Sequence, residues 1–227
     1  MNCQLISFVI KFASMSAVKT KAARRTTRDA VRQARNGVYR RHVLEAAEQV
    51  FADNGFEAAK LQSISKVAGL SMGTIYGVFP GKTELLDALL AERGSEILER
   101  AKAAVDGAAS PLAALDALID TYVAYFVEHP HFLRMHLRQG TSWVISPANG
   151  AGGRAVIWNE IHALQAQVFA AGIKAGVFVD EDPSFLAKTF SAMDQVLLSE
   201  WEAHGMKESP KQLADRLRAL VTRAFRR

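Results

Sequence analysis

A tight turn between two short helical segments constrains the fold of this chain more than any other feature. The segment before the turn ends at Gly69 and places four apolar side chains on one face: Leu61, Ile64, Val67 and Ala68. Gly69-Leu70-Ser71 follows at once, and Ser71 can cap a further helix in which Ile75 and Phe79 face inward until Pro80-Gly81 ends it. Helix, tight glycine-containing turn and helix is the arrangement with which helix-turn-helix proteins read DNA.

The rest of the chain is also helical in pattern. Upstream of the turn, apolar residues recur at helical spacing at Val43, Leu44, Ala47, Val50 and Phe51, and Asn54-Gly55 supplies a left-handed stop. Ordered structure is expected to begin near Gly37 or Val38. After Lys82 there is no strand-like alternation. Breaks at residues 107–111, 129–130, 140–153, 172–183 and 204–210 divide the chain into about six helices.

We therefore predict an all-α fold of about nine helices in three parts. Residues 1–36 form a flexible basic arm, residues 37–83 a three-helix helix-turn-helix DNA-binding domain, and residues 84–227 a larger helical effector-binding and dimerisation domain. The loop from Gly140 to Gly153 is long enough to be functional.

Positive charge is concentrated in the first third of the chain. Up to Lys82 there are 13 Lys and Arg against 5 Asp and Glu, whereas the other 145 residues hold 15 against 18. This asymmetry favours a nucleic-acid-binding module on a nearly neutral body. Between Lys19 and Arg41 nine basic residues accompany one acid, Asp29. That run fits either a solvated, disordered arm or an arm that lies along DNA phosphates or in the minor groove.

The extreme N-terminus offers no targeting or membrane signal. Cys3 is the single cysteine of the chain, so no intramolecular disulfide can form, and a reducing compartment fits. The apolar run from Leu5 to Ile10 is too short for a signal sequence or a membrane span. We expect a cytoplasmic protein without a membrane partner. Because Met15 opens a plausible alternative start, the first fourteen residues are open to a second interpretation, as an upstream extension.

Two glycines in the segment after the turn call for an explanation, since an interior helical glycine costs about 1 kcal/mol relative to alanine. A recognition helix needs an outward face without bulk, and Gly73 and Gly77 meet that need. Thr74 and Tyr76 can offer hydroxyl groups to phosphate or base. Lys82 stands in the first turn of the next helix, where it opposes the helix dipole unless a phosphate is bound nearby.

Residues 38–90 resemble the N-terminal domain of the TetR family of transcriptional regulators. The resemblance is carried by the run VLEAAEQVFADNGFEAAKLQSISKVAGLSMGTIYGVFPGKTELLDALL, which has the family's Ala-rich first helix, Gly-Phe, Ala-Gly-x-Ser-x-Gly-x-Ile-Tyr and Phe-Pro-x-Lys elements. It covers about a quarter of the chain. The resemblance implies that five residues lie on a DNA-facing surface, with Tyr76 and Lys82 mostly on phosphates: Ser71, Gly73, Thr74, Tyr76 and Lys82.

Departures from the family pattern shift the expected base contacts. The family often has a larger base-reading side chain at position 77 and an aromatic residue or His at 78, where this chain has Gly77 and Val78. Base contacts are then few, or they move to Gln62, Ser63, Met72 and the arm. Lys60 stands where the family commonly has a Ser or Thr cap, which leaves that cap in doubt and offers another phosphate contact.

The resemblance also implies that the body dimerises and encloses an inducer. The two last helices carry apolar bands suited to a four-helix interface, at Phe185, Phe190, Met193, Leu197, Trp201, Leu213, Leu217 and Leu220. An intramolecular core is the other interpretation of the same bands. Candidate effector-binding residues are Tyr122, Tyr125, Phe126, Phe132, Met135, His136, Trp143, Trp158, His162 and Phe169, although any single one of them can be ordinary core.

The predicted function is a DNA-binding repressor that a small, mostly apolar effector releases from a two-fold symmetric operator. Its partners are double-stranded DNA, a second copy of the chain and the effector. We expect no cofactor and no metal, because no ligand set accompanies His129, His131 and His136. An enzyme that uses the helical cavity is a second hypothesis, but the chain lacks known catalytic motifs. A protein with the same fold that acts through an interaction partner, without an effector, is the third.

Overall fold

The computed structural model describes residues 32–138 and 153–227. Within these residues there are nine helices and no strand beyond an isolated bridge between Phe178 and Arg226, which confirms the predicted all-α class. The chain divides into two compact units, residues 1–43 and residues 44–227. Of the first unit the structure describes only residues 32–43, the beginning of helix α1 (residues 32–58). The predicted boundaries at 36 and 83 stay predictions.

Helix α1 starts earlier than the sequence suggested. Residues 32–36 are already helical, although order was expected to begin only near Gly37. No proline interrupts this stretch, and one glycine costs a helix only about 1 kcal/mol, so Gly37 does not stop it. Residues 1–31, which hold the rest of the predicted arm, lie outside the described residues. At the other end Gly55 adopts the expected left-handed φ of 74°, but helical structure continues to residue 58.

Helices α2 (Leu61–Ala68) and α3 (Met72–Val78) form the predicted helix-turn-helix. Gly69 joins them with φ 64°, a left-handed conformation that only glycine adopts without strain. Ile64, Ile75 and Phe79 are buried, as their spacing predicted. The turn is thus set by one glycine and held by three apolar side chains.

Six further helices follow, and their ends fall at the predicted breaks. They are α4 (Lys82–Asp106), α5 (Pro111–Glu128), α6 (Pro130–Arg138), α7 (Gly153–Lys174), α8 (Pro183–Ala203) and α9 (Pro210–Phe225). Three of them begin with a capping side chain followed by proline: Ser110 caps α5, Asp182 caps α8 and Ser209 caps α9. These caps satisfy backbone N–H groups that have no partner inside the helix.

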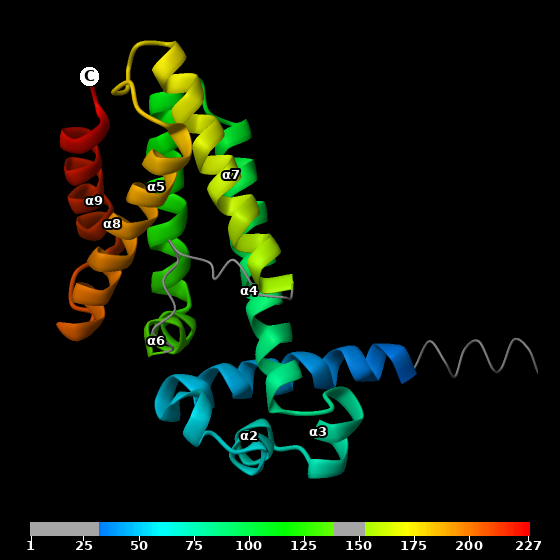
Figure 1. Ribbon diagram of the computed structural model, residues 1–227. Coiled ribbons are helices and arrows are strands. Elements are labelled where there is room, and N and C mark those ends of the chain that lie inside the picture. Colours follow the sequence, from blue (N-terminus) through cyan, green and yellow to red (C-terminus); the bar gives the residue numbers. More distant parts are fainter. Residues whose placement is uncertain (1–31, 139–152) are drawn as a thin grey trace, which may run out of the picture. The chain divides into compact units, whose positions relative to one another are not determined.

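Helix α5 is central in the body (Figure 1): it packs against α4, α6, α7 and α9, while α7 also contacts α4 and α8. Gly94 permits the close approach of α4 to α7, since a Cβ there would lie 2.8 Å from Cγ2 of Ile157. Arg218 ties α9 to α5 through Asp116 at 3.0 Å and Asp120 at 2.7 Å. Among the described residues no helix is both long and apolar enough to cross a bilayer.

Candidate nucleic-acid interface and ligand cavity

The N-terminus of α3 is built around Ser71. Its Oγ accepts a hydrogen bond from the Thr74 backbone N–H at 3.1 Å and lies 3.0 Å from Thr74 Oγ1. The predicted cap is therefore present, and both hydroxyl groups remain near the surface. Tyr76 is 54% exposed, whereas its neighbour Ile75 is fully buried. Helix α3 thus has one face in the core and one face free of packing.

The two glycines of α3 are not required by packing inside the protein. A Cβ at Gly77 would meet nothing within 4 Å, and at Gly73 the nearest atom would be Ser71 Oγ at 3.8 Å, an ordinary contact. Both residues have ordinary negative φ, so backbone conformation does not demand glycine either. The missing side chains leave a bare stretch of backbone on the outside of the helix.

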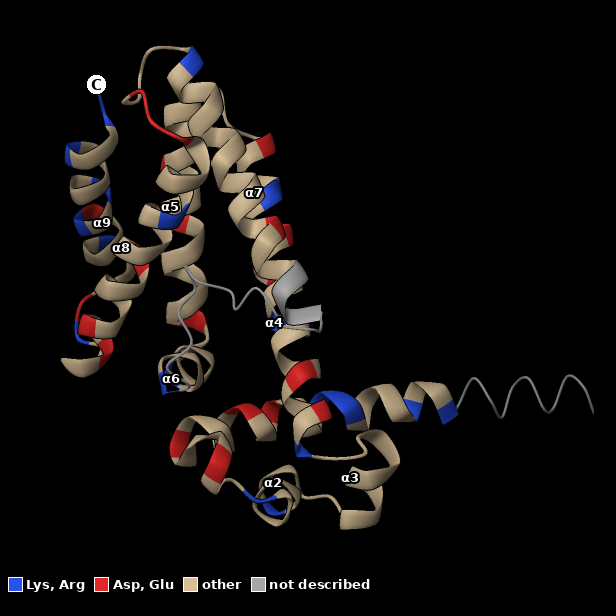
Figure 2. Cartoon of the chain, in the orientation of Figure 1, with Lys and Arg blue, Asp and Glu red and all other residues tan. Residues whose placement is uncertain are grey.

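The start of α2 contributes the other candidate contacts. Lys60, Gln62 and Ser63 are exposed, and Met72 at the start of α3 is half-buried. Lys60 occupies the N-cap position of α2 without a side-chain capping bond, as its replacement of Ser or Thr suggested. Figure 2 shows positive charge on and just before α2, where the sequence has Lys66 and Lys60, beside an uncharged α3. Contact of these residues with DNA stays a prediction.

Lys82 makes contacts inside the chain that were not predicted. Its ammonium donates to the backbone carbonyls of Phe56 at 2.6 Å, Glu57 at 3.1 Å and Ala59 at 3.2 Å, and it lies 4.4 Å from the centre of the Phe56 ring. Three donors meet three acceptors at the negative end of the α1 dipole. The lysine therefore caps α1 internally, and its contact with a phosphate stays a prediction. Side-chain reach, which sequence position does not show, decides the internal contacts.

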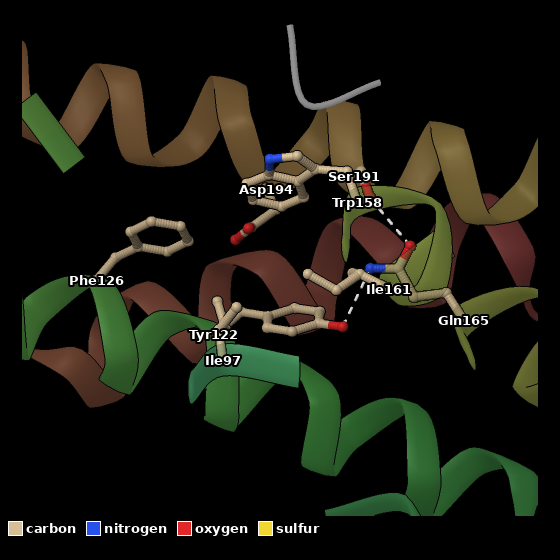
Figure 3. Close-up of a pocket in the computed structure, with 8 residues that line it drawn as sticks. All are labelled: Ile97, Tyr122, Phe126, Trp158, Ile161, Gln165, Ser191 and Asp194. Carbon is tan, nitrogen blue, oxygen red and sulfur yellow. Dashed lines mark hydrogen bonds between the residues drawn. The ribbon is translucent and has the colours of Figure 1, made fainter. Parts of the chain in front are cut away.

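A small cavity lies between α4, α5, α7 and α8 (Figure 3), lined by Ile97, Tyr122, Phe126, Trp158, Ile161, Gln165, Ser191 and Asp194. Its volume is about 10 Å³, which is room for one water molecule at most. The Gln165 amide bridges it: Nε2 donates to the Tyr122 hydroxyl at 3.3 Å, and Oε1 accepts from Ser191 Oγ at 3.0 Å. A ligand larger than a water molecule can enter only if side chains that line the cavity move.

Asp194 is the ionisable acid of this cavity. The residue is only 3% exposed, and its Oδ1 has no hydrogen-bond partner among the described residues. Burial raises the pKa of Asp194 to about 7. Sequence reasoning missed it, together with Gln165 and Ser191. A signal existed, since Asp194 stands four residues from both Phe190 and Leu198, inside an apolar stripe.

Three of the predicted effector-binding residues line the cavity: Tyr122, Phe126 and Trp158. The other described candidates lie elsewhere in the core. Tyr125 donates to the Arg93 carbonyl at 3.0 Å. Phe132, Met135 and His136 are buried on α6, with His136 5.3 Å from the Trp158 ring. His162 is half-buried on α7. Phe169 packs on Phe178 and Phe225. Trp143 lies outside the described residues.

The predicted dimerisation residues divide into two groups. Phe190, Leu197, Trp201, Leu213 and Leu217 are buried within the single chain, so for them the intramolecular interpretation is right. Met193 is half-buried. Phe185 and Leu220 are 58% and 43% exposed, and Val196, a member of the same predicted apolar band, is 64% exposed. An apolar band identifies a buried face, but its partner is decided only by packing.

An ion-pair cluster links α1 to the body. Arg93 on α4 contacts Glu48 Oε2 at 2.7 Å and Glu96 Oε2 at 3.0 Å, and Tyr125 of α5 donates to the Arg93 backbone. Glu48 is only 5% exposed, so this pair is largely shielded from water. No sequence motif predicts this cluster, since its members are separated by up to 77 positions. Among the described residues, no group of three or more His, Cys, Asp or Glu is placed to hold a metal ion.

Comparison with known proteins supports this description. A family model described as bacterial regulatory proteins, tetR family, matches residues 43–89. The HTH-type transcriptional regulator UidR of Escherichia coli K12 is 32% identical over 68 residues, which are 30% of this chain and 35% of that protein. The chain thus spans about a third of that relative's length.

Solved structures extend the likeness to the whole fold. A TetR-family transcriptional regulator from Agrobacterium tumefaciens matches with a TM-score of 0.68 at 17% identity, over 83% of this chain and 98% of that one. The regulator FadR from Bacillus subtilis, solved with stearoyl-CoA, matches with a TM-score of 0.68 at 19% identity, over 79% and 96%. At these identities the likeness shows the fold alone. Residues 43–89 thus match the N-terminal domain of the tetR family of bacterial regulatory proteins, and the helical fold is one that solved TetR-family regulators share.

Proposed function

We propose that this protein is a DNA-binding transcriptional regulator that represses from a two-fold symmetric operator until a small effector releases it. The observation that carries the proposal is the outward face of α3. Gly73 and Gly77 leave its backbone bare although nothing inside the protein needs the space, and Tyr76 projects beside them. A bare helix face flanked by a hydroxyl group suits close approach to a DNA groove.

The charge distribution supports the same partner. Exposed Lys60 and Lys66 lie on or next to α2, while α3 itself is uncharged. Phosphate contacts from α2 would orient the protein, and contacts along α3 would read the bases. Counterion release should then make the affinity fall steeply with salt.

A two-fold symmetric operator requires two copies of the helix-turn-helix that α2 and α3 form. Phe185 and Val196 on α8 and Leu220 on α9 leave apolar surface exposed in the single chain. A second copy would cover this surface with the same helices, which gives the isologous contact of a two-fold dimer. Half-sites would then lie one helical turn of DNA, or a multiple of it, apart.

The cavity supports an effector. It lies where α4 meets α5, α7 and α8. Helix α4 also carries Arg93, which forms an ion pair with Glu48 of α1. A ligand that widens the cavity would displace α4 and so change the separation of the two α3 helices in a dimer. The ligand would thereby shift the population between two conformations. Stearoyl-CoA in the solved FadR shows that one protein with this fold binds a ligand with a long apolar part.

The test is selection of bound sequences from a random DNA pool, followed by affinity measurements with variants. Tyr76→Ala and Lys60→Ala should each weaken binding about tenfold, as loss of a groove or phosphate contact does. Lys174→Ala is a charge-matched control, since Lys174 is exposed at the end of α7. Recovery of no preferred, two-fold symmetric sequence would contradict the proposal, and so would equal losses in the control. Retardation of any DNA regardless of sequence would favour an interaction protein instead.

A further inference from the structure

We propose that the cavity between α4, α5, α7 and α8 takes a ligand with one protonated amine, which Asp194 pairs as its counter-ion. This rests on the proposed effector function and names the chemical class of the effector. Figure 3 shows the Asp194 carboxylate pointing into the space that Phe126, Trp158 and Tyr122 surround.

The first step is that Asp194 lacks a partner. Its residue is 97% buried and Oδ1 finds no hydrogen bond in the described part of the chain. A buried polar atom without a partner costs free energy, and in a native structure such an atom calls for an explanation. The amide and hydroxyl groups of the lining are committed to one another, because Gln165 is held by Tyr122 and Ser191. Asp194 is therefore the polar group available to a ligand.

The second step is that no protein cation compensates Asp194. Its pKa is raised by burial, with no charged neighbour among the causes. Tyr122, His136 and His162 are titratable groups on the packed helices. On α4, close to Ile97 in the sequence, Glu96 and Arg100 pair with each other at 2.9 Å. On α9, Arg218 is held by Asp116 and Asp120 of α5, and Lys188 of α8 is exposed. The described lining holds neither Lys nor Arg.

The third step selects a cation over a neutral or anionic head group. An anion would meet Asp194 without any compensating charge, which is repulsive. A protonated amine would supply the missing counter-charge and a hydrogen-bond donor, and the rings of Tyr122, Phe126 and Trp158 offer faces that attract cations. One buried acid among three aromatic rings is thus complementary to an amine on an apolar body.

The size of the cavity adds a requirement. About 10 Å³ is open, so the body of the ligand must displace part of the wall. Of the three lining aromatic residues, Tyr122 and Phe126 are buried and Trp158 is half-buried. Trp158 is the least buried of the three rings, and its fluorescence should change when the ligand enters.

The experiment uses three probes with one body and different heads: 2-phenylethylamine, 2-phenylethanol and phenylacetate. Calorimetric titration of the full-length protein at about pH 8 keeps Asp194 ionised and the amine protonated. We expect the amine to bind at least about tenfold more tightly than the other two probes. Asp194→Asn should remove the preference for the amine and change the dissociation constant of the alcohol by no more than roughly twofold. Asp180→Asn, at an exposed position, should change nothing.

A second measurement needs no variant. Lowering the pH to about 6 protonates Asp194 and should weaken amine binding severalfold while the alcohol stays level. The inference is overturned if the amine binds no better than the alcohol, if Asp194→Asn keeps the preference, if phenylacetate binds best, or if no amine binding appears at millimolar concentration. Operator binding is measured separately. A protein that binds its operator but not the amine disproves this ligand class alone, and one that binds the amine but no operator disproves the proposed regulator.

Discussion

Arg93 Nε lies 2.7 Å from Glu48 Oε2, and this contact joins α4 to the largely buried acid of α1. The same guanidinium reaches Glu96, and the Arg93 backbone carbonyl accepts from Tyr125. Three helices therefore meet at Arg93. Because α4 also lines the cavity through Ile97, a shift of α4 would be felt at this ion pair.

Replacing Arg93 by Met should destabilise the protein by roughly 3 kcal/mol, because Glu48 would remain buried without its counter-charge. Glu48→Gln with Arg93→Met should recover part of the loss. Denaturant unfolding of Arg93→Met, Glu48→Gln and the double variant forms a double-mutant cycle. Lys211→Ala is the control, since its pair with Asp215 is exposed and screened by water, so its loss should change stability far less. Equal effects for Lys211 and Arg93 would count against a special role of the shielded pair.

Lys82→Gln should cost roughly 1 to 3 kcal/mol of stability, since three carbonyls at the end of α1 lose a charged donor. It should leave the salt dependence of DNA binding unchanged. Lys60→Gln should do the reverse, with little effect on unfolding and a salt slope lower by about one. A stable Lys82→Gln protein with a reduced salt slope would restore Lys82 to the phosphate contact first predicted for it.

Gly73→Ala and Gly77→Ala should stabilise the protein by up to about 1 kcal/mol each while weakening operator binding. Alanine is the better helix former and its Cβ has room at both sites. The methyl group would lie between the helix and DNA. Gly172→Ala is the contrasting control, because its Cβ would lie 2.0 Å from the Phe178 ring and should destabilise the fold. Stabilisation together with full DNA affinity would show that α3 does not approach DNA closely.

Asp194 should make stability depend on pH. Its folded pKa is about 7, above the ordinary value of 3.8, so the folded state holds the proton more tightly than the unfolded chain does. Stability is then greatest below about pH 4, falls as the pH rises toward 7 and levels off above it, with a total change of at most roughly 4 kcal/mol. Asp194→Asn should abolish this slope, and Asp180→Asn should keep it. The measurement is the unfolding midpoint at pH 5 and at pH 8. The same pH dependence of stability in the wild type and in Asp194→Asn would contradict the raised pKa of Asp194.

Val196→Asp and Leu220→Asp should each raise the dimer dissociation constant about 100-fold, since a charge would enter an apolar contact. Val67→Asp provides the matched control, as Val67 is 48% exposed on α2, away from α8 and α9. Sedimentation equilibrium gives the constants directly. Dimers that tolerate both changes would place the interface elsewhere.

Much of the fold was predictable from local sequence. Gly69 and Ser71 marked the turn and the cap because one tolerates a left-handed backbone and the other offers a short side-chain acceptor. The breaks before Pro111, Pro130, Pro183 and Pro210 likewise marked helix starts, since proline fits the first turn and no later one. Such signals act within a few residues, so they can be read along the chain.

Pairings between distant residues could not be predicted in this way. The same apolar periodicity marked Phe190 and Leu220, yet one is buried inside the chain and the other exposed. Lys82 was placed on DNA by its position, whereas its long side chain turns to the end of α1. Sequence determined the helices, the turn and the inward residues of the helix-turn-helix, because those depend on local backbone and spacing. Only tertiary packing decided which faces meet, which charges pair and that Asp194 is left buried beside a cavity, because burial and counter-charge are properties of the assembled helices.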